Sequence, residues 1–218
     1  GAEGMESVIA QFHCELADAA SSAGELEAAR RHAGDALAIH PRSARAQLVL
    51  GKIARRLGEA EAAIRHFEKM AEIDPDFLPE VLADLIRLYD QRGDTARAEA
   101  FLDLMMQRDR GVAALLARSA MLERSRGAAE AVAFLAEQLE HRPSVRGVLR
   151  VLDLSFPEDA ENPPEAVPLI RDLLKRLLER KPAYRCSRCG FSPRAMHWQC
   201  PSCKSWGTTK PVHGLSGD

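Results

Sequence analysis

The feature that most constrains this chain is a glycine that returns at an almost constant interval. Four glycines are separated by 34, 35 and 34 residues, and three prolines that follow them are separated by 34 and 68 residues. Glycine lets a chain turn after a helix, and proline prevents a helix from continuing. The period therefore predicts a repeated pair of antiparallel helices. The residues that mark it are Gly24, Gly58, Gly93 and Gly127, and Pro41, Pro75 and Pro143.

The repeated unit matches the tetratricopeptide type, whose period is about 34 residues. Small residues recur at equivalent places of the first two units: Ala17 corresponds to Gly51, and Ala29 to Ala63. Small side chains let helices approach closely, so these positions should lie where the helices of a pair touch. Aromatic residues make up only 5% of the chain, whereas the helix formers Ala, Leu, Arg and Glu are abundant. We therefore expect residues 6–181 to form an all-α tetratricopeptide-repeat solenoid.

Four of the five cysteines form two Cys-x-x-Cys pairs, Cys186 with Cys189 and Cys200 with Cys203. Each pair bends the backbone so that both sulfur atoms face one point, and two pairs complete a tetrahedral four-sulfur site. Thiolate sulfur selects zinc or iron, and we prefer a single zinc ion to iron. Residues 182–213 are predicted to form a small rubredoxin-like or zinc-ribbon module that needs its metal to fold and packs on the last helices.

Two other uses of these cysteines are open. An iron-filled site could carry electrons, as in rubredoxins. A reactive dithiol fits less well, because it needs one active pair on a scaffold of alternating strands and helices. Four cysteines already fill the metal shell, so His197 is not expected to be a ligand. The aromatic residues of the module should form its small core and its contact with the adjacent helix: Tyr184, Phe191, Trp198 and Trp206.

The solenoid is predicted to end in one more helix pair, formed by "SVRGVLRVLDL" and "PPEAVPLIRDLLKRLLER". Pro163 and Pro164 suit the first turn of the second helix, and Pro168 should lie near that start too. A repeat stack leaves apolar surface exposed at its end unless something covers it. We expect the metal module to be that cover, and we expect the apolar stripe of the last helix to be core: Ile170, Leu173, Leu174, Leu177 and Leu178.

No catalytic constellation is evident in the sequence. It has no phosphate-binding glycine loop, no His-Glu-x-x-His motif and no arrangement of Ser, His and Asp typical of hydrolases. We therefore expect a protein that is not an enzyme. The remaining histidines have no second ligand at matched spacing, so they are predicted to be surface or interhelix packing residues: His13, His32, His40, His66 and His141.

Charge is distributed unevenly along the chain. Residues 181–213 carry six Lys or Arg and no acid, whereas residues 1–180 carry 24 basic and 31 acidic side chains. The cations of the module are candidates for binding acidic partners or membrane phosphates, or they only balance the acidic repeats. A nucleic-acid partner is not expected, because the rest of the chain is acidic. The candidate partner surface consists of Arg185, Arg188, Arg194 and Lys204.

The stretch "YRCSRCGFSPRAMHWQCPSCKSWGTTKP", with "FHCELADAA" near the start and the repeats between them, resembles the lipopolysaccharide assembly protein B family of Gram-negative bacteria. Members of this family begin with a membrane-spanning helix, followed by further repeats. The chain itself has no run of 18 apolar residues. The resemblance implies a soluble C-terminal fragment of a protein held at the cytoplasmic side of the inner membrane.

The resemblance also implies a function. Family members are adaptors that promote degradation of the LpxC deacetylase by the FtsH protease, and so regulate lipopolysaccharide synthesis. It makes Cys186, Cys189, Cys200 and Cys203 the metal ligands and transfers no catalytic residues. Lipopolysaccharide and membrane phosphates are further candidate partners, and the sequence leaves open whether lipopolysaccharide binds directly. Two alternatives from the residues alone are a tetratricopeptide scaffold for some other protein complex and a rubredoxin-type electron carrier.

Overall fold

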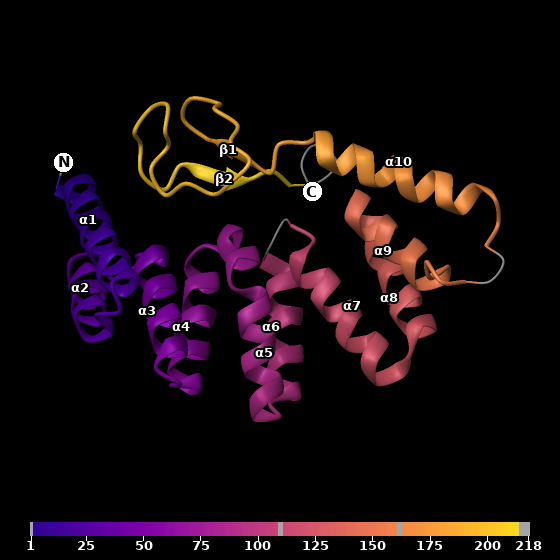
Figure 1. The fold of residues 1–218 in the computed structure, drawn as a ribbon, viewed down its shortest axis with the longest axis horizontal. Helices are drawn as coiled ribbons and strands as arrows, with labels where there is room; N and C mark the ends of the chain where they lie inside the picture. The colour runs from indigo at the N-terminus through magenta and orange to yellow at the C-terminus, as the bar shows by residue number, and fades with distance from the viewer. Residues whose placement is uncertain (1, 109–110, 161–162, 214–218) are drawn as a thin grey trace. The chain divides into compact units, whose positions relative to one another are not determined.

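A computed structural model describes residues 2–108, 111–160 and 163–213 of the protein. These residues form α-helices joined by short connections, one 3-10 helix, and a two-stranded antiparallel sheet in the cysteine-rich end (Figure 1). This order confirms the predicted array of helix pairs with a small C-terminal module. The elements are α1 (Ala2–Ser22), α2 (Leu26–Ile39), α3 (Ala44–Arg56), α4 (Ala60–Ile73), η1 (Pro75–Glu80), α5 (Leu82–Arg92), α6 (Thr95–Arg108), α7 (Ala113–Arg126), α8 (Ala128–His141), α9 (Val145–Ser155), α10 (Ala166–Arg180), β1 (Tyr184–Cys186) and β2 (Thr209–Pro211).

Glycine turns join the two helices of each of the first three pairs. Gly24, Gly58 and Gly93 are left-handed, with φ of 85°, 77° and 70°. A residue with a Cβ atom disfavours this conformation, which is why the period is carried by glycine. The amide that follows each glycine donates to a carbonyl oxygen five positions back, as Glu59 does to Ala54 at 2.9 Å. The glycine period is therefore confirmed as the turn of a helix pair.

The three periodic prolines also lie where the repeat places them. Each lies two residues beyond the end of a helix: Pro41 after α2, Pro75 after α4 and Pro143 after α8. The fourth turn has a different shape, because Gly127 combines φ of 93° with an extended ψ of 170°. The repeat is therefore regular in its helix ends and less regular in its last glycine turn.

The chain divides into two compact units, residues 1–101 and 102–218. In the first unit α1 packs against α2, α2 against α3 and α3 against α4, and η1 contacts both α4 and α5. In the second unit α7 packs against α8, α8 against α9 and α9 against α10. Packing between successive helices is the pattern of a repeat array. Among the described residues, no helix combines the length and the apolar character needed to cross a lipid bilayer.

Small residues set the spacing of the first two helix pairs. A Cβ atom added to Gly51 on α3 would come within 2.4 Å of the Phe67 ring on α4. Ala17, Ala29 and Ala63 are fully buried. The prediction that small residues lie inside each helix pair is therefore confirmed at these positions.

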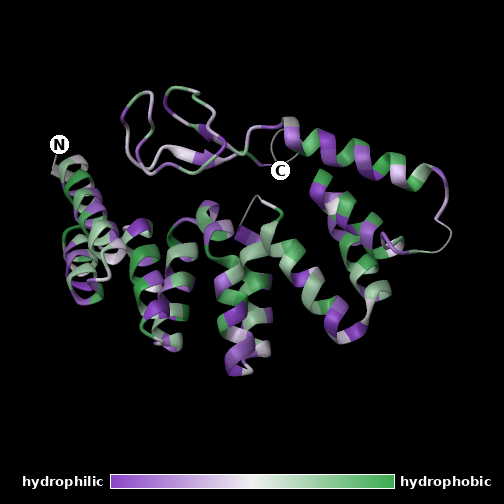
Figure 2. Cartoon of the chain, viewed as in Figure 1, coloured by the Kyte–Doolittle hydropathy of each residue, from purple (hydrophilic) through white to green (hydrophobic). Residues whose placement is uncertain are grey.

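The apolar stripe of α10 is largely exposed, which corrects an expectation from the sequence. Ile170, Leu173 and Leu177 are 44%, 49% and 49% exposed, so their assignment to the core is wrong. Figure 2 shows hydrophobic and hydrophilic residues alternating along this helix. The reason is the rotation of α10 about its axis: its buried residues are Val167 and Arg171, and Arg171 Nε donates to Asp153 of α9 at 2.9 Å.

The connection into α10 also differs in detail from the prediction. The helix begins at Ala166, so Pro163 and Pro164 precede it and do not form its first turn. Pro168 does lie in the first turn, where a missing amide costs no hydrogen bond. The prediction is therefore confirmed for Pro168 alone.

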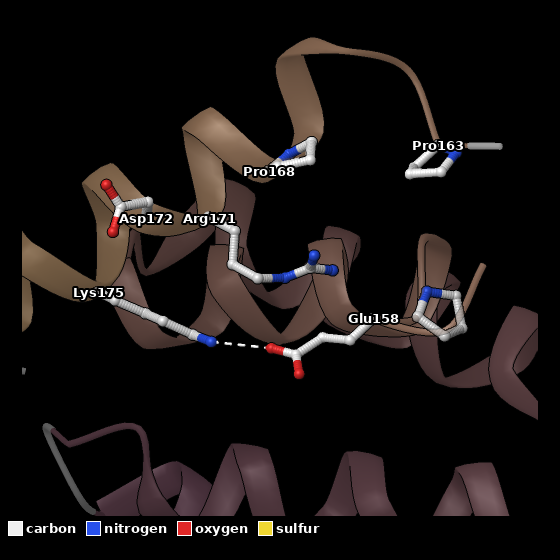
Figure 3. Close-up of a pocket in the computed structure, with 7 residues that line it drawn as sticks. Glu158, Pro163, Pro168, Arg171, Asp172 and Lys175 are labelled. Atoms are coloured by element: carbon white, nitrogen blue, oxygen red, sulfur yellow. Dashed lines mark hydrogen bonds and ion pairs between the residues drawn. The ribbon is translucent and has the colours of Figure 1, made fainter. Parts of the chain in front are cut away.

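A surface pocket lies beside this connection (Figure 3). Lys175 Nζ on α10 donates to Glu158 at 2.9 Å, and Arg171 donates to the carbonyl oxygen of Phe156. These contacts attach the segment after α9 to α10. The pocket is lined by Pro157, Glu158, Pro163, Pro168, Arg171, Asp172 and Lys175.

Candidate metal centre

Backbone pairing brings the two cysteine turns together. β1 pairs antiparallel with β2, with Cys186 opposite Thr209. An antiparallel bridge between Gln199 and Trp206 encloses the second turn. Strands this short have little stability of their own, so the turns need a further link between them.

The two Cys-x-x-Cys turns have the same backbone structure. In each, the amide of the first cysteine donates to the carbonyl oxygen five residues later, at 2.8 Å for Cys186 and 2.9 Å for Cys200. The amide of the residue after the second cysteine donates back to the first cysteine, at 2.9 Å in both turns. That residue has positive φ in both turns, 76° at Gly190 and 59° at Lys204. Each turn thus directs its two sulfur atoms to one side.

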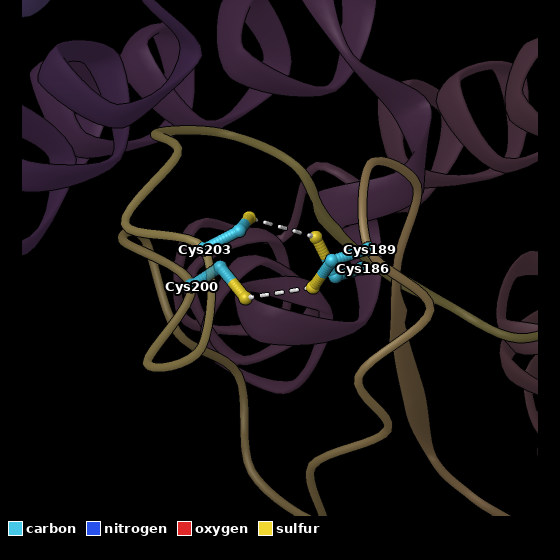
Figure 4. Close-up of side chains that lie close together, drawn as sticks. All are labelled: Cys186, Cys189, Cys200 and Cys203. Carbon is cyan, nitrogen blue, oxygen red and sulfur yellow. Dashed lines mark hydrogen bonds between the residues drawn. The ribbon is translucent and has the colours of Figure 1, made fainter.

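The four sulfur atoms have the spacing of a metal site (Figure 4). Cys186 Sγ lies 3.8 Å from Cys203 Sγ, and Cys189 Sγ lies 3.7 Å from Cys200 Sγ. A tetrahedron with metal–sulfur bonds of about 2.3 Å has edges of about 3.8 Å. Both short contacts join one turn to the other, so an ion at the centre would link them. The ligand atoms therefore fit a single ion, with zinc and iron both compatible.

Hydroxyl groups of the module favour ionised cysteines. A hydrogen bond with Thr208, whose Oγ1 lies 3.2 Å from Cys186 Sγ, lowers the pKa of Cys186 to about 6. A hydrogen bond with Ser205 likewise lowers the pKa of Cys203. At Cys200 the backbone amide of Cys203 lowers the pKa, but burial and the neighbouring sulfur atoms outweigh it and raise the pKa to about 11. Adjacent thiolates repel one another, so a divalent cation is what lets all four ionise together.

The aromatic residues contribute less to the interior of the module than predicted. Phe191 is 41% exposed, so its assignment to the core is wrong. Tyr184, Trp198 and Trp206 are half-buried. The interior is built around sulfur, which agrees with a module that needs a metal to fold. The buried residues of the module are Cys186, Pro193, Cys200 and Thr209.

The other predicted site residues lie on the surface of the module. Arg188 donates to Ser205 Oγ at 2.6 Å, a contact between the two cysteine turns. His197 is half-buried, and among the described residues the ligand group at this site consists of the four cysteines. All four members of the candidate partner surface are exposed, and their role in recognition stays a prediction: Arg185, Arg188, Arg194 and Lys204.

Sequence reasoning missed a second group of metal-ligating side chains. His13 on α1 and His32 and Asp35 on α2 offer one ligand atom each, and these atoms lie within 4.8 Å of one another. The prediction that His13 and His32 are isolated is therefore wrong. His32 and Asp35 share a helix face at a spacing of three residues, a signal that the sequence does contain. His13 joins them only through the packing of α1 on α2.

Comparison with known proteins matches both parts of this structure. The family described as rubredoxin metal binding domain matches residues 184–211. Two families described as tetratricopeptide repeat match residues 14–76 and 54–119. The protein is therefore a tetratricopeptide array that carries a rubredoxin-like four-cysteine metal-binding module.

Two relatives match almost the whole chain. Lipopolysaccharide assembly protein B of Escherichia coli (strain K12) is 30% identical to this chain over 210 residues, which are 96% of the chain and 54% of the relative. The protein of the same name from Haemophilus influenzae is 29% identical over 206 residues, 94% of the chain and 52% of the relative. The chain is a homologue of these two proteins along nearly its whole length, as its sequence suggested. It spans about half the length of these relatives.

Proposed function

We propose that this protein is a non-enzymatic adaptor that regulates lipopolysaccharide synthesis by promoting degradation of the LpxC deacetylase by the FtsH protease. The observation that carries the proposal is similarity to lipopolysaccharide assembly protein B along 96% of the chain, through both the repeats and the metal module. Tetratricopeptide arrays bind other proteins over the surface that successive helices form. Such a role needs binding surfaces and requires no reacting side chain.

Two exposed features support a binding role. α10 presents Ile170, Leu173 and Leu177 to solvent, and exposed apolar side chains in a row are typical of protein-binding surfaces. The metal module presents exposed cations, among them Arg188 and Arg194, which suit acidic protein segments or the phosphates of lipids and lipopolysaccharide. We propose that α10 binds LpxC or FtsH and that the cations help to select an acidic partner.

The proposed place of action is the cytoplasmic side of the inner membrane. A membrane helix outside the 218 residues of this chain would hold the full-length protein there, beside the membrane-bound protease. Attachment to the same membrane raises the effective concentration of adaptor and protease, so moderate affinities are sufficient.

The test is a pull-down of the full-length protein from cells that produce FtsH and LpxC, combined with measurement of the LpxC half-life. Both proteins should co-purify with the adaptor, and LpxC should be degraded faster when the adaptor is present. The double variants Leu173→Gln/Leu177→Gln and Arg188→Glu/Arg194→Glu should each capture less of at least one partner. Replacing the four cysteines should abolish capture.

Two control variants change exposed charges elsewhere. Arg176→Gln alters α10 at a polar position, and Lys52→Glu reverses a charge on α3. Both should capture the partners as the unchanged protein does. Absence of both partners, together with an unchanged LpxC half-life, would overturn the proposal. Metal analysis and visible spectroscopy test the electron-carrier alternative. A rubredoxin-type carrier contains iron, and its visible absorption changes reversibly on oxidation and reduction.

A further inference from the structure

We infer that His13, His32 and Asp35 form a second metal site, which takes one divalent transition-metal ion between the first two helices. The site lies in the first compact unit and shares no residue with the four-cysteine centre. It would link α1 to α2 within the first repeat.

The placement of the three side chains follows from the helix pair. His32 and Asp35 are three residues apart on α2, so they lie on the same face of that helix. α1 packs against α2 and brings the His13 ring to 6.1 Å from the His32 ring, measured between centroids. His13 Nδ1 lies 3.8 Å from Asp35 Oδ2. Two helices thus supply ligands from three positions.

The two imidazoles have unsatisfied nitrogen atoms. Among the described residues, neither His13 Nδ1 nor His32 Nδ1 has a hydrogen-bond partner, although both atoms are buried. A buried polar atom without a partner is unfavourable, and two such atoms beside one carboxylate are unusual. The contact between His13 Nδ1 and Asp35 Oδ2, at 3.8 Å, is too long for a hydrogen bond, and Nδ1 of His32 has no such contact within the described part of the chain to explain its burial. A cation bound by all three side chains accounts for both nitrogens.

The ligand set also selects a class of ion. Two imidazoles and one carboxylate suit zinc, iron(II), cobalt or nickel, whereas magnesium and calcium prefer oxygen ligands. Metal–ligand bonds of about 2.0–2.1 Å in a tetrahedral site place the ligand atoms about 3.4 Å apart. The observed 3.8 Å between His13 Nδ1 and Asp35 Oδ2 needs only a small side-chain rotation to reach that value. Asp35 is 60% exposed, so water can complete the coordination.

The test is a cobalt(II) titration of the full chain after the four-cysteine centre has been filled with zinc and excess metal removed. One further equivalent of cobalt should bind, with weak visible bands and without the sulfur-to-cobalt absorption of a thiolate site. The variants His13→Gln, His32→Gln and Asp35→Asn should each weaken binding by about tenfold or more, since loss of a direct ligand costs at least as much as loss of its supporting contacts. The matched control is His141→Gln, which replaces an exposed histidine of α8 and should leave cobalt binding unchanged.

Circular dichroism checks that each variant is folded. If one is not, the unchanged protein still decides the matter, because bound cobalt should broaden the NMR signals of the His13 and His32 rings and leave that of His141 sharp. If no further equivalent of cobalt binds at concentrations up to about 1 mM, the inference is overturned. Water would then satisfy the two histidine nitrogen atoms. Binding that survives all three substitutions would also overturn it.

Discussion

Gly51 sets the distance between α3 and α4, because the Phe67 ring occupies the space that a side chain would need. We predict that Gly51→Ala lowers the free energy of unfolding by about 1–3 kcal/mol, since the added methyl group displaces the ring. Urea unfolding measures the change. The control is Gly34→Ala on α2, where nothing lies within 4 Å of the added atom. There the better helix propensity of alanine should stabilise the protein by up to about 1 kcal/mol, and equal effects at both sites would contradict the packing argument.

Tyr89 belongs to a polar network inside the first unit. Its hydroxyl donates to Glu68 at 2.6 Å, and Arg97 donates to Glu68 at 2.7 Å. A hydrogen bond to a charged group contributes about 1.5–3 kcal/mol, so we predict a loss of that size in Tyr89→Phe at neutral pH. Urea unfolding of the two proteins gives the value. Glu72→Gln, which loses an exposed contact with Lys69, should change stability much less.

The same tyrosine makes stability depend on pH. Burial, and then the hydrogen bond and charge of Glu68, raise the pKa of Tyr89 above its ordinary value of about 10. The folded state therefore favours the neutral phenol, and this contribution is complete below pH of about 10 and is lost as the pH rises further. The advantage of the unchanged protein over Tyr89→Phe should shrink above that pH. A constant difference up to about pH 11 would contradict the assignment.

Among the described residues, Lys204 is the only residue with positive φ that is not glycine. Gly190 holds the equivalent place in the first cysteine turn. We predict that Lys204→Gly is neutral or stabilises the metal module by up to about 1 kcal/mol, because it removes the strain of a side chain at φ of 59°. Gly190→Ala should destabilise it by about 1–2 kcal/mol. Chelator competition for the bound metal reports both changes, and a stabilised Gly190→Ala variant would contradict the prediction.

At the scale of elements, we expect the metal module to depend on its ion more than on its packing. Its interior contains few apolar side chains, and metal binding in small four-ligand modules contributes about 10–16 kcal/mol. We predict that chelation unfolds residues 182–213 and leaves the helical signal of α1 to α10 largely unchanged. NMR and circular dichroism follow the two parts, and zinc should restore the module. A module that stays folded after complete removal of metal would disprove this dependence.

α10 shows what a pattern within one element predicts and what it leaves open. Leucines at helical spacing predicted a helix and an apolar face, and both are present. Which side of the helix is covered depends on the rotation of the helix, and here that side carries the buried Val167 and Arg171, with Arg171 bonded to Asp153 of α9. The cysteine turns were predictable in more detail, because a Cys-x-x-Cys spacing determines the local backbone as well as the ligands.

For the whole molecule, the repeat period was enough to predict the order and the ends of most helices. Gly58 and Pro75, for example, lie at the turn and the helix end that their spacing required. The His13–His32–Asp35 group was not predicted, because it depends on how one helix is placed along another. Periodicity in the sequence identifies which face of a helix is buried, but not how far the helix is shifted along its neighbour. The exposure of Phe191 was missed for a similar reason, since an aromatic residue in a small module has few neighbours to cover it.

The repeat organisation also predicts how far a change extends. Each repeat contacts mainly its neighbours, so perturbations at separate places should act independently. We predict that Gly51→Ala destabilises the first helix pairs and leaves the metal affinity of the four-cysteine centre unchanged. Chelator competition on this variant and on the unchanged protein measures that affinity. A change larger than about twofold would show that the two regions are coupled.

Both close sulfur contacts of the metal centre join the first cysteine turn to the second. During translation, Cys186 and Cys189 therefore leave the ribosome before the site can exist, and the last ligand appears only with Cys203. An ion held by all four sulfur atoms can be captured only after the helices that precede them have been synthesised. An occupied centre would therefore mark chains that have been translated at least through Cys203, and prematurely terminated chains would lack it.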